Sequence, residues 1–276
     1  MNDVAVAETP PSKSTSLKRI LVIVAIGLAS INIVQFARGV TADRISAQEL
    51  REVLSPRSTT DRFHNLFYKD PNTIERNRWM GIPAIQNPND VWITQEILFE
   101  VKPDFVIEAG SYMGGSAAMW AMMLREVNPS GRVITIDIQD LVGEARKLPI
   151  FKERVDFLLG SSTAPEIVAE VSRRVAGHRV VVILDSDHHK AHVLKELKAY
   201  AGLVQKGGYI IVQDSNINGH PVVIAPTDSA SMYANQPGPM EALTEFLASD
   251  KRFKIDLDRE RLMLTMNPNG YLRRVN

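Results

Sequence analysis

One stretch of this chain indicates its architecture: Val106-Ile107-Glu108-Ala109-Gly110-Ser111-Tyr112-Met113-Gly114-Gly115-Ser116. A short apolar run ends in an acid, and a glycine-rich turn and a helix-forming segment follow it. This order is typical of the first parallel strand of a Rossmann-like sheet, where the turn lets the backbone approach a nucleotide-type cofactor. A dinucleotide fingerprint needs G-x-G-x-x-G, and Tyr112 occupies the position of its second glycine. The spacing therefore argues against a dinucleotide.

Strands and helices alternate from residue 105 onward. The sequence predicts strands at 105–109, 133–137, 155–159, 180–185, 209–214, 253–256 and 262–266, and helices at 116–126, 165–175, 191–203 and 239–248. Continuous runs of valine, isoleucine and leucine favour strands that are buried on both faces. This pattern predicts an α/β fold with a Rossmann-like, seven-stranded sheet that is mostly parallel and ends in an antiparallel hairpin.

Composition limits the number of domains and the classes of partner. The 276 residues are enough for one large α/β domain, predicted at 105–276, and a helical and loop-rich cap at 41–104. In the cap we expect a short helix at 41–55 that ends at Pro56, loops at 61–90, and a helix from Pro88 to about residue 101. The net charge is zero and cysteine is absent, so we expect no nucleic-acid partner and no thiolate metal site.

Four predicted strands end in an acidic residue: Glu108, Asp137, Asp185 and Asp214. The carboxyl ends of parallel strands line one crevice, where a carboxylate either accepts hydrogen bonds from a cofactor or binds a metal. Asp137 is well placed for a ribose. The turn Gly160-Ser161-Ser162 follows the third strand and is suited to a position beside an adenine.

A second acidic cluster points to a metal ion. Asp187 lies in the stretch 184–190, and Asp214 follows it after 27 residues. Two carboxylates at adjacent strand ends fit a hard divalent cation, and magnesium is the expected ion. His188 and His192 make zinc a less favoured alternative, because a third imidazole is lacking. In a purely structural interpretation, Asp187 caps the following helix and the histidines are solvated.

The residues 108–117 resemble the cofactor motif of class I S-adenosylmethionine-dependent methyltransferases, in particular the magnesium-dependent catechol type. The stretch Asp187-His188-His189-Lys190 resembles the metal-aspartate segment of that type, in which the lysine is the general base. Over roughly residues 75–270 the layout is similar to the rhamnosyl O-methyltransferase/cephalosporin hydroxylase family, which includes the cephamycin 7-methoxylation protein.

This resemblance implies a role for each motif. The residues expected to bind S-adenosylmethionine are Glu108, Gly110, Tyr112, Gly114, Gly115, Ser116, Asp137, Gly160, Ser161, Ser162 and Asp185. Asp187 and Asp214 are expected to hold Mg²⁺, with Gln213, Ser215, Asn216 or water as the third ligand. The catalytic residues are Lys190, which removes the proton of a substrate hydroxyl, and His188, which lies near the adenine.

The implied activity is magnesium-assisted O-methylation of a hydroxyl on a sugar, a glycolipid or a secondary metabolite. The segment 215–238 is expected to close over the acceptor, and Trp79, His220 and Tyr233 are equally suited to acceptor contact and to packing. Two other classes compete with this activity: an NAD(P)-dependent oxidoreductase, and a non-catalytic, membrane-tethered binding module. The missing second glycine argues against the former and the complete set of acids against the latter.

The amino terminus differs in composition from the rest. Residues 1–16 are small and polar and are expected to be disordered. Lys18-Arg19 precede an apolar run at 20–36, so the segment 17–40 predicts a membrane-anchoring helix; a cleaved signal and a buried or interfacial helix are the alternatives. A membrane-anchored protein with a cytoplasmic catalytic domain is expected, because S-adenosylmethionine is made in the cytoplasm. The sequence leaves a homo-oligomer open.

Overall fold

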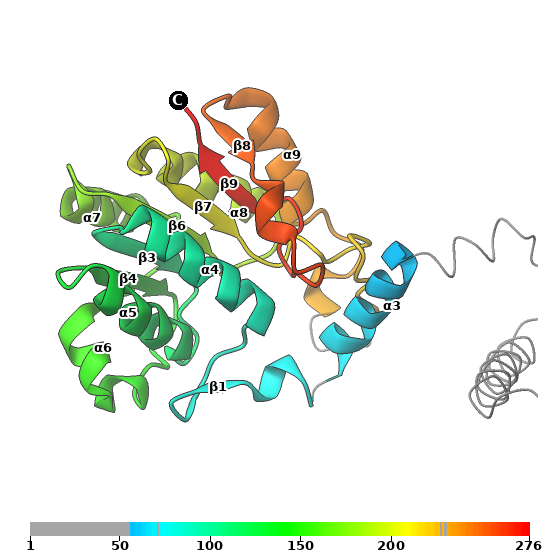
Figure 1. The fold of residues 1–276 in the computed structure, drawn as a ribbon, viewed down its shortest axis with the longest axis horizontal. Helices are drawn as coiled ribbons and strands as arrows, with labels where there is room; N and C mark the ends of the chain where they lie inside the picture. Colours follow the sequence, from blue (N-terminus) through cyan, green and yellow to red (C-terminus); the bar gives the residue numbers. More distant parts are fainter. Residues whose placement is uncertain (1–55, 71, 227, 229–230) are drawn as a thin grey trace, which may run out of the picture. The chain divides into compact units, whose positions relative to one another are not determined.

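The computed structural model describes residues 56–276 except 71, 227, 229 and 230 (Figure 1). The predicted segments 1–16, 17–40 and 41–55 lie outside the described residues. No helix within the described part of the chain has the length and apolar character needed to cross a bilayer. The expected membrane-anchored localisation is therefore wrong.

A seven-stranded sheet forms the centre of the fold, in the order β5-β4-β3-β6-β7-β9-β8. Only β9 runs antiparallel, against both of its neighbours β7 and β8. This arrangement confirms the predicted mostly parallel sheet with a terminal antiparallel hairpin. The strands are β3 (Phe105–Ala109), β4 (Arg132–Asp137), β5 (Val155–Leu159), β6 (Val180–Leu184), β7 (Tyr209–Val212), β8 (Phe253–Ile255) and β9 (Tyr271–Arg274).

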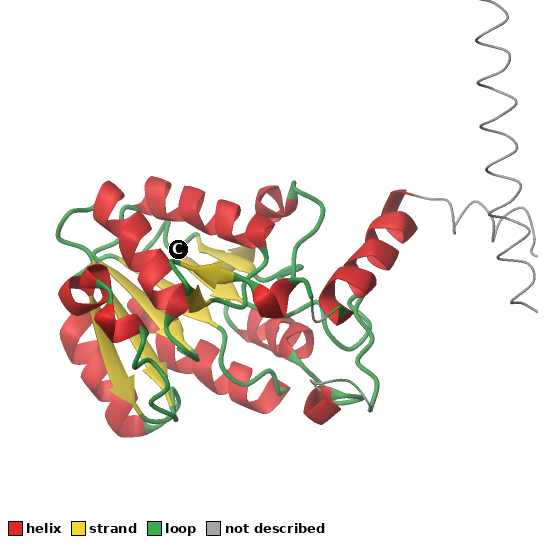
Figure 2. Cartoon of the chain, turned by 90° about the horizontal axis from the view of Figure 1, so that it is seen from below, coloured by secondary structure: helices red, strands yellow, loops and turns green. Residues whose placement is uncertain are grey.

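Helices cover both faces of the sheet, as Figure 2 shows. One face packs against α4 (Pro88–Val101), α5 (Gly115–Val127) and α6 (Pro149–Arg154), and the other against α7 (Pro165–Val175), α8 (Lys190–Tyr200) and α9 (Pro239–Ser249). Successive strand residues point to opposite faces, so Val106 and Ile107 of β3 belong to different halves of the core. Burial on both faces explains the continuous apolar runs in the sequence.

The last strand differs from the prediction. The predicted strand 262–266 is irregular, and the strand is instead β9, where Tyr271 and Leu272 are buried against β7 and β8. Leu262 and Met263 are exposed, and the backbone of Met263 has a φ of 68°, which a strand does not accommodate. The hydrophobic pattern of 262–266 therefore gave a false strand signal.

The region before β3 also differs, because Pro56 begins a helix instead of ending one. Proline is favoured in the first turn of a helix, where its missing N–H has no partner to lose. This helix is α3 (Pro56–Lys69), and it replaces the loop expected from residue 61 onward. The remaining short elements are β1 (Arg78–Trp79), β2 (Ile82–Pro83), η1 (Ile74–Arg76), η2 (Ala145–Lys147), η3 (Ala201–Leu203), η4 (Ser231–Tyr233) and η5 (Leu257–Glu260).

A buried carboxyl group joins β3 to its neighbours. Glu108 is 1% exposed, and it accepts hydrogen bonds from Trp120 Nε1 of α5 at 2.8 Å and from Thr135 Oγ1 of β4 at 2.5 Å. The Thr135 hydroxyl also lies 2.6 Å from Ser111 Oγ in the glycine turn. Burial raises the pKa of Glu108 to about 7. This network fixes the glycine turn relative to two strands and a helix.

The raised pKa predicts a pH-dependent stability. The folded chain keeps the Glu108 proton up to about pH 7, whereas the unfolded chain releases it near the ordinary value of 4.5, so stability falls as the pH rises through this window. Glu108→Gln removes this ionisation. Between pH 4.5 and 8 the wild-type free energy of unfolding should fall by up to about 3 kcal/mol relative to the variant.

Urea unfolding at several pH values measures this difference. The exchange Glu126→Gln, at an exposed position of the same helix α5, controls for the loss of one negative charge. A difference between wild type and Glu108→Gln that stays constant from pH 4.5 to 8 would contradict the prediction.

Candidate functional site

One cavity of about 690 Å³ opens at the carboxyl edge of the parallel strands. The predicted site residues that line it are Gly110, Tyr112, Ser116, Asp137, Gly160, Ser161, Ser162, Asp185, Asp187, His188 and Asp214. Six others do not line it: Glu108, Gly114, Gly115, Lys190, Gln213 and Ser215. The structure therefore brings most of the predicted residues to one place.

The glycines of the first turn are required by close packing. A Cβ atom at Gly110 would lie 1.9 Å from the carbonyl oxygen of Asp185, so there is no room for a side chain between Gly110 and the backbone that follows β6. A Cβ atom at Gly115 would lie 2.2 Å from the carbonyl oxygen of Pro83. Gly114 is the N-cap residue directly before α5 and has a φ of 83°. Gly114 and Gly115 thus shape the turn without lining the cavity.

Asp137 joins the end of β4 to the glycine turn. Its Oδ2 accepts the backbone N–H groups of Ser111 at 3.0 Å and Tyr112 at 2.9 Å, and its Oδ1 accepts that of Gln139 at 3.0 Å. An ionised carboxylate has about four acceptor positions, so Asp137 retains capacity for a ligand hydroxyl.

A buried carboxylate that the sequence gave no reason to select connects the turns after β5 and β6. Glu196 of α8 is fully buried, and its Oε1 accepts hydrogen bonds from Ser186 Oγ at 2.6 Å and from Ser162 Oγ at 2.5 Å. His192 Nε2 lies 3.3 Å from the same oxygen, and this hydrogen bond raises the pKa of His192. Ser162, Ser186 and His192 line the cavity, so Glu196 shapes its wall from behind.

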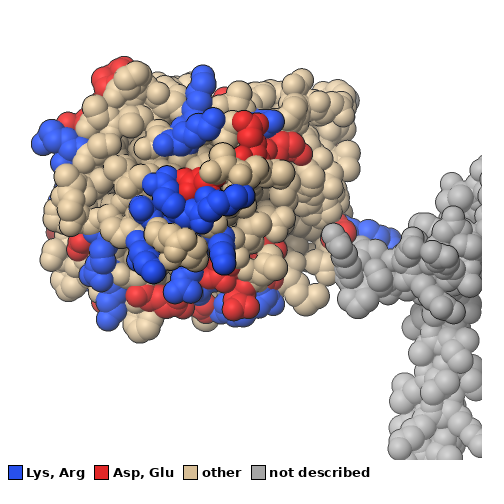
Figure 3. Space-filling view, turned by 90° about the horizontal axis from the view of Figure 1, so that it is seen from above, with Lys and Arg blue, Asp and Glu red and all other residues tan. Residues whose placement is uncertain are grey.

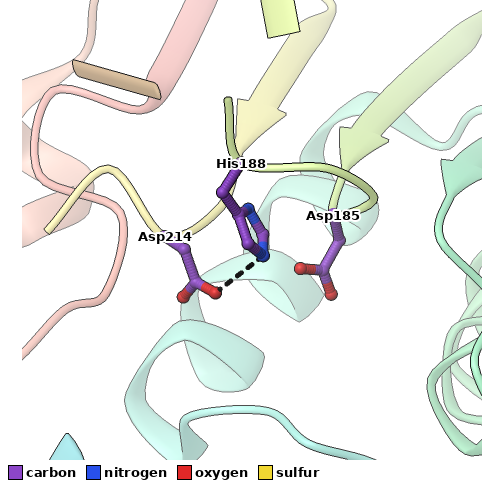
Figure 4. A group of neighbouring side chains, drawn as sticks. All are labelled: Asp185, His188 and Asp214. Atoms are coloured by element: carbon purple, nitrogen blue, oxygen red, sulfur yellow. Dashed lines mark ion pairs between the residues drawn. The ribbon is translucent and has the colours of Figure 1, made fainter. Parts of the chain in front are cut away.

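Asp185, His188 and Asp214 form a cluster within the cavity, and their potential metal-ligand atoms all lie within 4.8 Å of one another. Asp185 follows β6 and Asp214 follows the neighbouring strand β7; Figure 4 shows the imidazole of His188 between the two carboxylates. His188 Nε2 is 3.2 Å from Asp214 Oδ2. Gln86, which precedes α4, donates a hydrogen bond from Nε2 to Asp185 Oδ2 at 2.8 Å.

The two carboxylates repel each other when both are ionised. Burial, and then the charge of Asp214, raise the pKa of Asp185 well above its usual range. Burial also raises the pKa of Asp214, although His188 opposes this. Lysine and arginine gather on the outer surface, as Figure 3 shows, but none is among the described residues that line the cavity. The donor set therefore fits a divalent cation with oxygen ligands.

Asp187 does not belong to this cluster, contrary to the expectation that it binds the metal. Its side chain is 44% exposed, and its Oδ1 accepts the N–H of His189 at 2.9 Å and lies 2.6 Å from His189 Nδ1. The turn after β6 directs Asp185, the residue next to the strand, toward Asp214 instead. Position directly after the strand was the signal in the sequence that distinguishes the two aspartates.

The other two metal candidates are also directed elsewhere. Gln213 is 7% exposed and Ser215 is fully buried, and neither lines the cavity. Ser215 Oγ donates a hydrogen bond to the carbonyl oxygen of Pro268 at 2.6 Å. The cluster thus consists of two aspartates and a histidine.

The expected general base, Lys190, is paired outside the cavity. Its Nζ lies 2.9 Å from Glu245 Oε2 of α9, and both side chains are partly exposed. The basic side chain inside the cluster is His188.

Of the three possible acceptor contacts, Tyr233 lines the cavity, whereas Trp79 and His220 have other partners. Trp79 Nε1 donates a hydrogen bond to Met122 Sδ at 3.2 Å, and His220 Nε2 lies 2.9 Å from Glu241 Oε1.

Comparison with known proteins identifies relatives of this chain. The family model for rhamnosyl O-methyltransferase/CmcI matches residues 72–275. A rhamnosyl O-methyltransferase of Mycobacterium bovis (strain BCG / Pasteur 1173P2) is 35% identical over 222 residues, which cover 78% of this chain and 84% of the relative. The corresponding protein of Mycobacterium leprae (strain TN) is 34% identical over 205 residues, or 71% of this chain and 86% of the relative.

Solved structures share the fold. CmcI described with Mg and S-adenosylmethionine (D160 form) has a TM-score of 0.55 at 20% identity, with 86% of this chain and 88% of that chain covered. The apo structure of the N160 form has a TM-score of 0.53 at 19% identity, with 73% and 77% covered. The family model and the curated relatives confirm the resemblance seen in the sequence and favour methyl transfer over the alternative classes. The chain belongs to the rhamnosyl O-methyltransferase/CmcI family and is an O-methyltransferase.

Proposed function

We propose that this protein transfers the methyl group of S-adenosylmethionine to a hydroxyl of a sugar, with Mg²⁺ held by Asp185 and Asp214 and with His188 as the general base. The observation that carries this proposal is the cluster of two strand-end carboxylates and one imidazole inside the cavity. The curated relatives are named rhamnosyl O-methyltransferases, which supports a sugar as the acceptor.

The cofactor occupies the end of the cavity beside β3, β4 and β5. The turn 110–116 and Ser116 at the start of α5 receive its methionine portion, because free N–H groups at a helix start suit a carboxylate. Asp137 accepts the ribose hydroxyls. Ile138 and Leu141 are exposed apolar residues of the same wall, and with the turn 160–162 they offer contacts to the flat adenine.

The preference of Mg²⁺ for oxygen ligands assigns different roles to the two aspartates and the histidine. Mg²⁺ prefers carboxylate and water oxygens to imidazole nitrogen, so Asp185 and Asp214 are its ligands and His188 is left to accept a proton. When bound, Mg²⁺ supplies Lewis-acid chemistry that makes a hydroxyl easier to deprotonate.

The side chains of His188 and Asp214 then assist the transfer of the methyl group. His188 takes the proton of the acceptor hydroxyl, while Asp214, 3.2 Å from its Nε2, orients the imidazole and stabilises the charge that it gains. The acceptor oxygen forms a bond to the methyl carbon as the carbon–sulfur bond breaks, which yields the methyl ether and S-adenosylhomocysteine. Holding both reactants in one cavity removes most of the entropic cost of their encounter.

The assignment of the metal ligands predicts opposite results for neighbouring aspartates. Asp185→Asn and Asp214→Asn should each weaken divalent-cation binding by more than the roughly 10- to 100-fold that is lost when a residue hydrogen-bonded to a metal ligand is removed, and should abolish methyl transfer. Asp187→Asn, the matched control two residues away, should retain both. Mn²⁺ titration followed by electron paramagnetic resonance measures the binding. Loss of Mn²⁺ in Asp187→Asn alone would reverse the assignment.

The assignment of the base is tested with a second pair of variants. His188→Gln should lower kcat by about 10²- to 10⁴-fold, because a positioned base is lost, and should leave the Mn²⁺ affinity nearly unchanged. Lys190→Gln removes an ion pair with Glu245 outside the cavity and should keep most of the activity. If His188→Gln also lost Mn²⁺, His188 would be a ligand. If only Lys190→Gln lost kcat, the lysine would be the base.

The activity itself is tested with the full chain, S-adenosylmethionine, Mg²⁺ and 4-nitrophenyl α-L-rhamnopyranoside. Mass spectrometry should detect a rhamnoside that has gained one methyl group and an equal amount of S-adenosylhomocysteine. EDTA should stop the reaction and added Mg²⁺ should restore it, because the two facing carboxylates need the cation. Absence of a methylated rhamnoside at saturating cofactor and Mg²⁺ would refute a sugar acceptor.

A further inference from the structure

Helix α3 lies outside the span 72–275 that the family model matches, yet one of its faces contacts the segment that follows Asp214. His64 and Tyr68 are four residues apart and therefore share a helix face. His64 is 3% exposed, and its Nε2 lies 3.0 Å from Nδ2 of the buried Asn216, two residues after Asp214. The helix is thus packed directly beside the metal-binding end of β7.

Hydrogen bonds from Asn65 fix the position of α3. Its Nδ2 donates to the carbonyl oxygen of Pro221 at 2.9 Å, and its Oδ1 accepts the N–H of Val223 at 3.1 Å. Lys69, at the end of the helix, lies 3.8 Å from Asp228. Because Asn65 pairs with the backbone on both sides of Val222, α3 and this segment are held as one wall.

Tyr68 lies on this wall one turn beyond His64. Its ring packs against a small apolar cluster of Ile217, Val222 and Ile224, and Tyr233 packs against the same cluster. The ring of Tyr233 lies 5.1 Å from that of His188 in an edge-on arrangement and lines the cavity. Tyr233 therefore lies beside the proposed base, and Tyr68, from a distant part of the sequence, shares its apolar cluster.

The phenol of Tyr68 is neutral in the folded chain, because burial is the main effect on its pKa. Burial raises the pKa of Tyr68, and the carboxylates of Asp214 and Asp185, followed by Tyr233, raise it further. The phenol consequently keeps its proton and is available as a neutral hydrogen-bond donor. A ring with an apolar face and a neutral hydroxyl group is suited to a sugar, which offers C–H groups and oxygens together.

We propose that Tyr68 is an acceptor-contacting residue that, with Tyr233, forms the aromatic wall against which the sugar lies while its hydroxyl faces Asp185, His188 and Asp214. This inference rests on the proposed function. It assigns a specificity-determining role to α3, a helix outside the matched family span, so acceptor choice is set partly by residues that the family model does not include.

The experiment compares Tyr68→Phe and Tyr68→Ala with Leu66→Ala, a control on the same helix whose side chain is 68% exposed. The full chain is assayed with S-adenosylmethionine, Mg²⁺ and 4-nitrophenyl α-L-rhamnopyranoside. Loss of the hydroxyl should raise the KM for the rhamnoside by about 2- to 10-fold, and loss of the ring by more than about tenfold. The KM for S-adenosylmethionine and the Kd for S-adenosylhomocysteine should stay nearly constant, and Leu66→Ala should match the wild type.

The outcomes separate the inference from the proposed function. If the wild type methylates the rhamnoside and both Tyr68 variants keep its KM, the inference is overturned and the function stands. An equal rise of both KM values, or of the Kd for S-adenosylhomocysteine, would show a merely structural role and also overturn it. If the wild type does not methylate the rhamnoside, the sugar acceptor and this inference both fall. Tyr68→Phe keeps the ring, so it tests the inference even if Tyr68→Ala does not fold.

Discussion

The proposed chemistry of this protein depends on the mutual repulsion of two carboxylates that the sheet holds together. β6 and β7 are adjacent parallel strands, so the residues that follow them, Asp185 and Asp214, emerge side by side at the same edge. Without a positive partner, such a pair raises the pKa of its members and costs stability. A divalent cation relieves this electrostatic cost. Two buried carboxylates with raised pKa values inside a cavity are therefore a reason to expect a cation there.

The rest of the fold keeps the pair in place. Gly110 lets β3 approach the backbone of Asp185, and Gln86 holds one oxygen of its carboxylate. The Glu108 network fixes the glycine turn on the other side, so cofactor and cation are positioned from one set of strand ends. The proposed acceptor wall consists of α3 and the segment after Asp214, which lie far apart in the sequence and are joined by hydrogen bonds of Asn65 and His64.

Much of this arrangement was predictable from the sequence. The apolar runs predicted the five parallel strands β3 to β7 to within one or two residues, and four of these runs end in an acid. The glycine turn indicated the cofactor end of the cavity. Local patterns failed where tertiary contacts decide. The apolar residues 262–266 look like a strand, yet Asp90 binds this segment through Met266 and the final strand forms at β9. The sequence predicted that Pro56 ends a helix, but Pro56 is the first residue of α3. Asp187 matched the spacing of the metal-aspartate segment that the sequence resembles, whereas the turn geometry after β6 directs Asp185 toward Asp214. Spacing alone does not encode that direction.

The most direct test of the central claim is the position of the cation. A crystal of the full chain soaked with Mn²⁺ and S-adenosylhomocysteine, measured at the manganese absorption edge, locates the ion by anomalous scattering. The account predicts one peak within bonding distance of an oxygen of Asp185 and an oxygen of Asp214. A peak coordinated by Asp187, or no peak between the two strand ends, would contradict it.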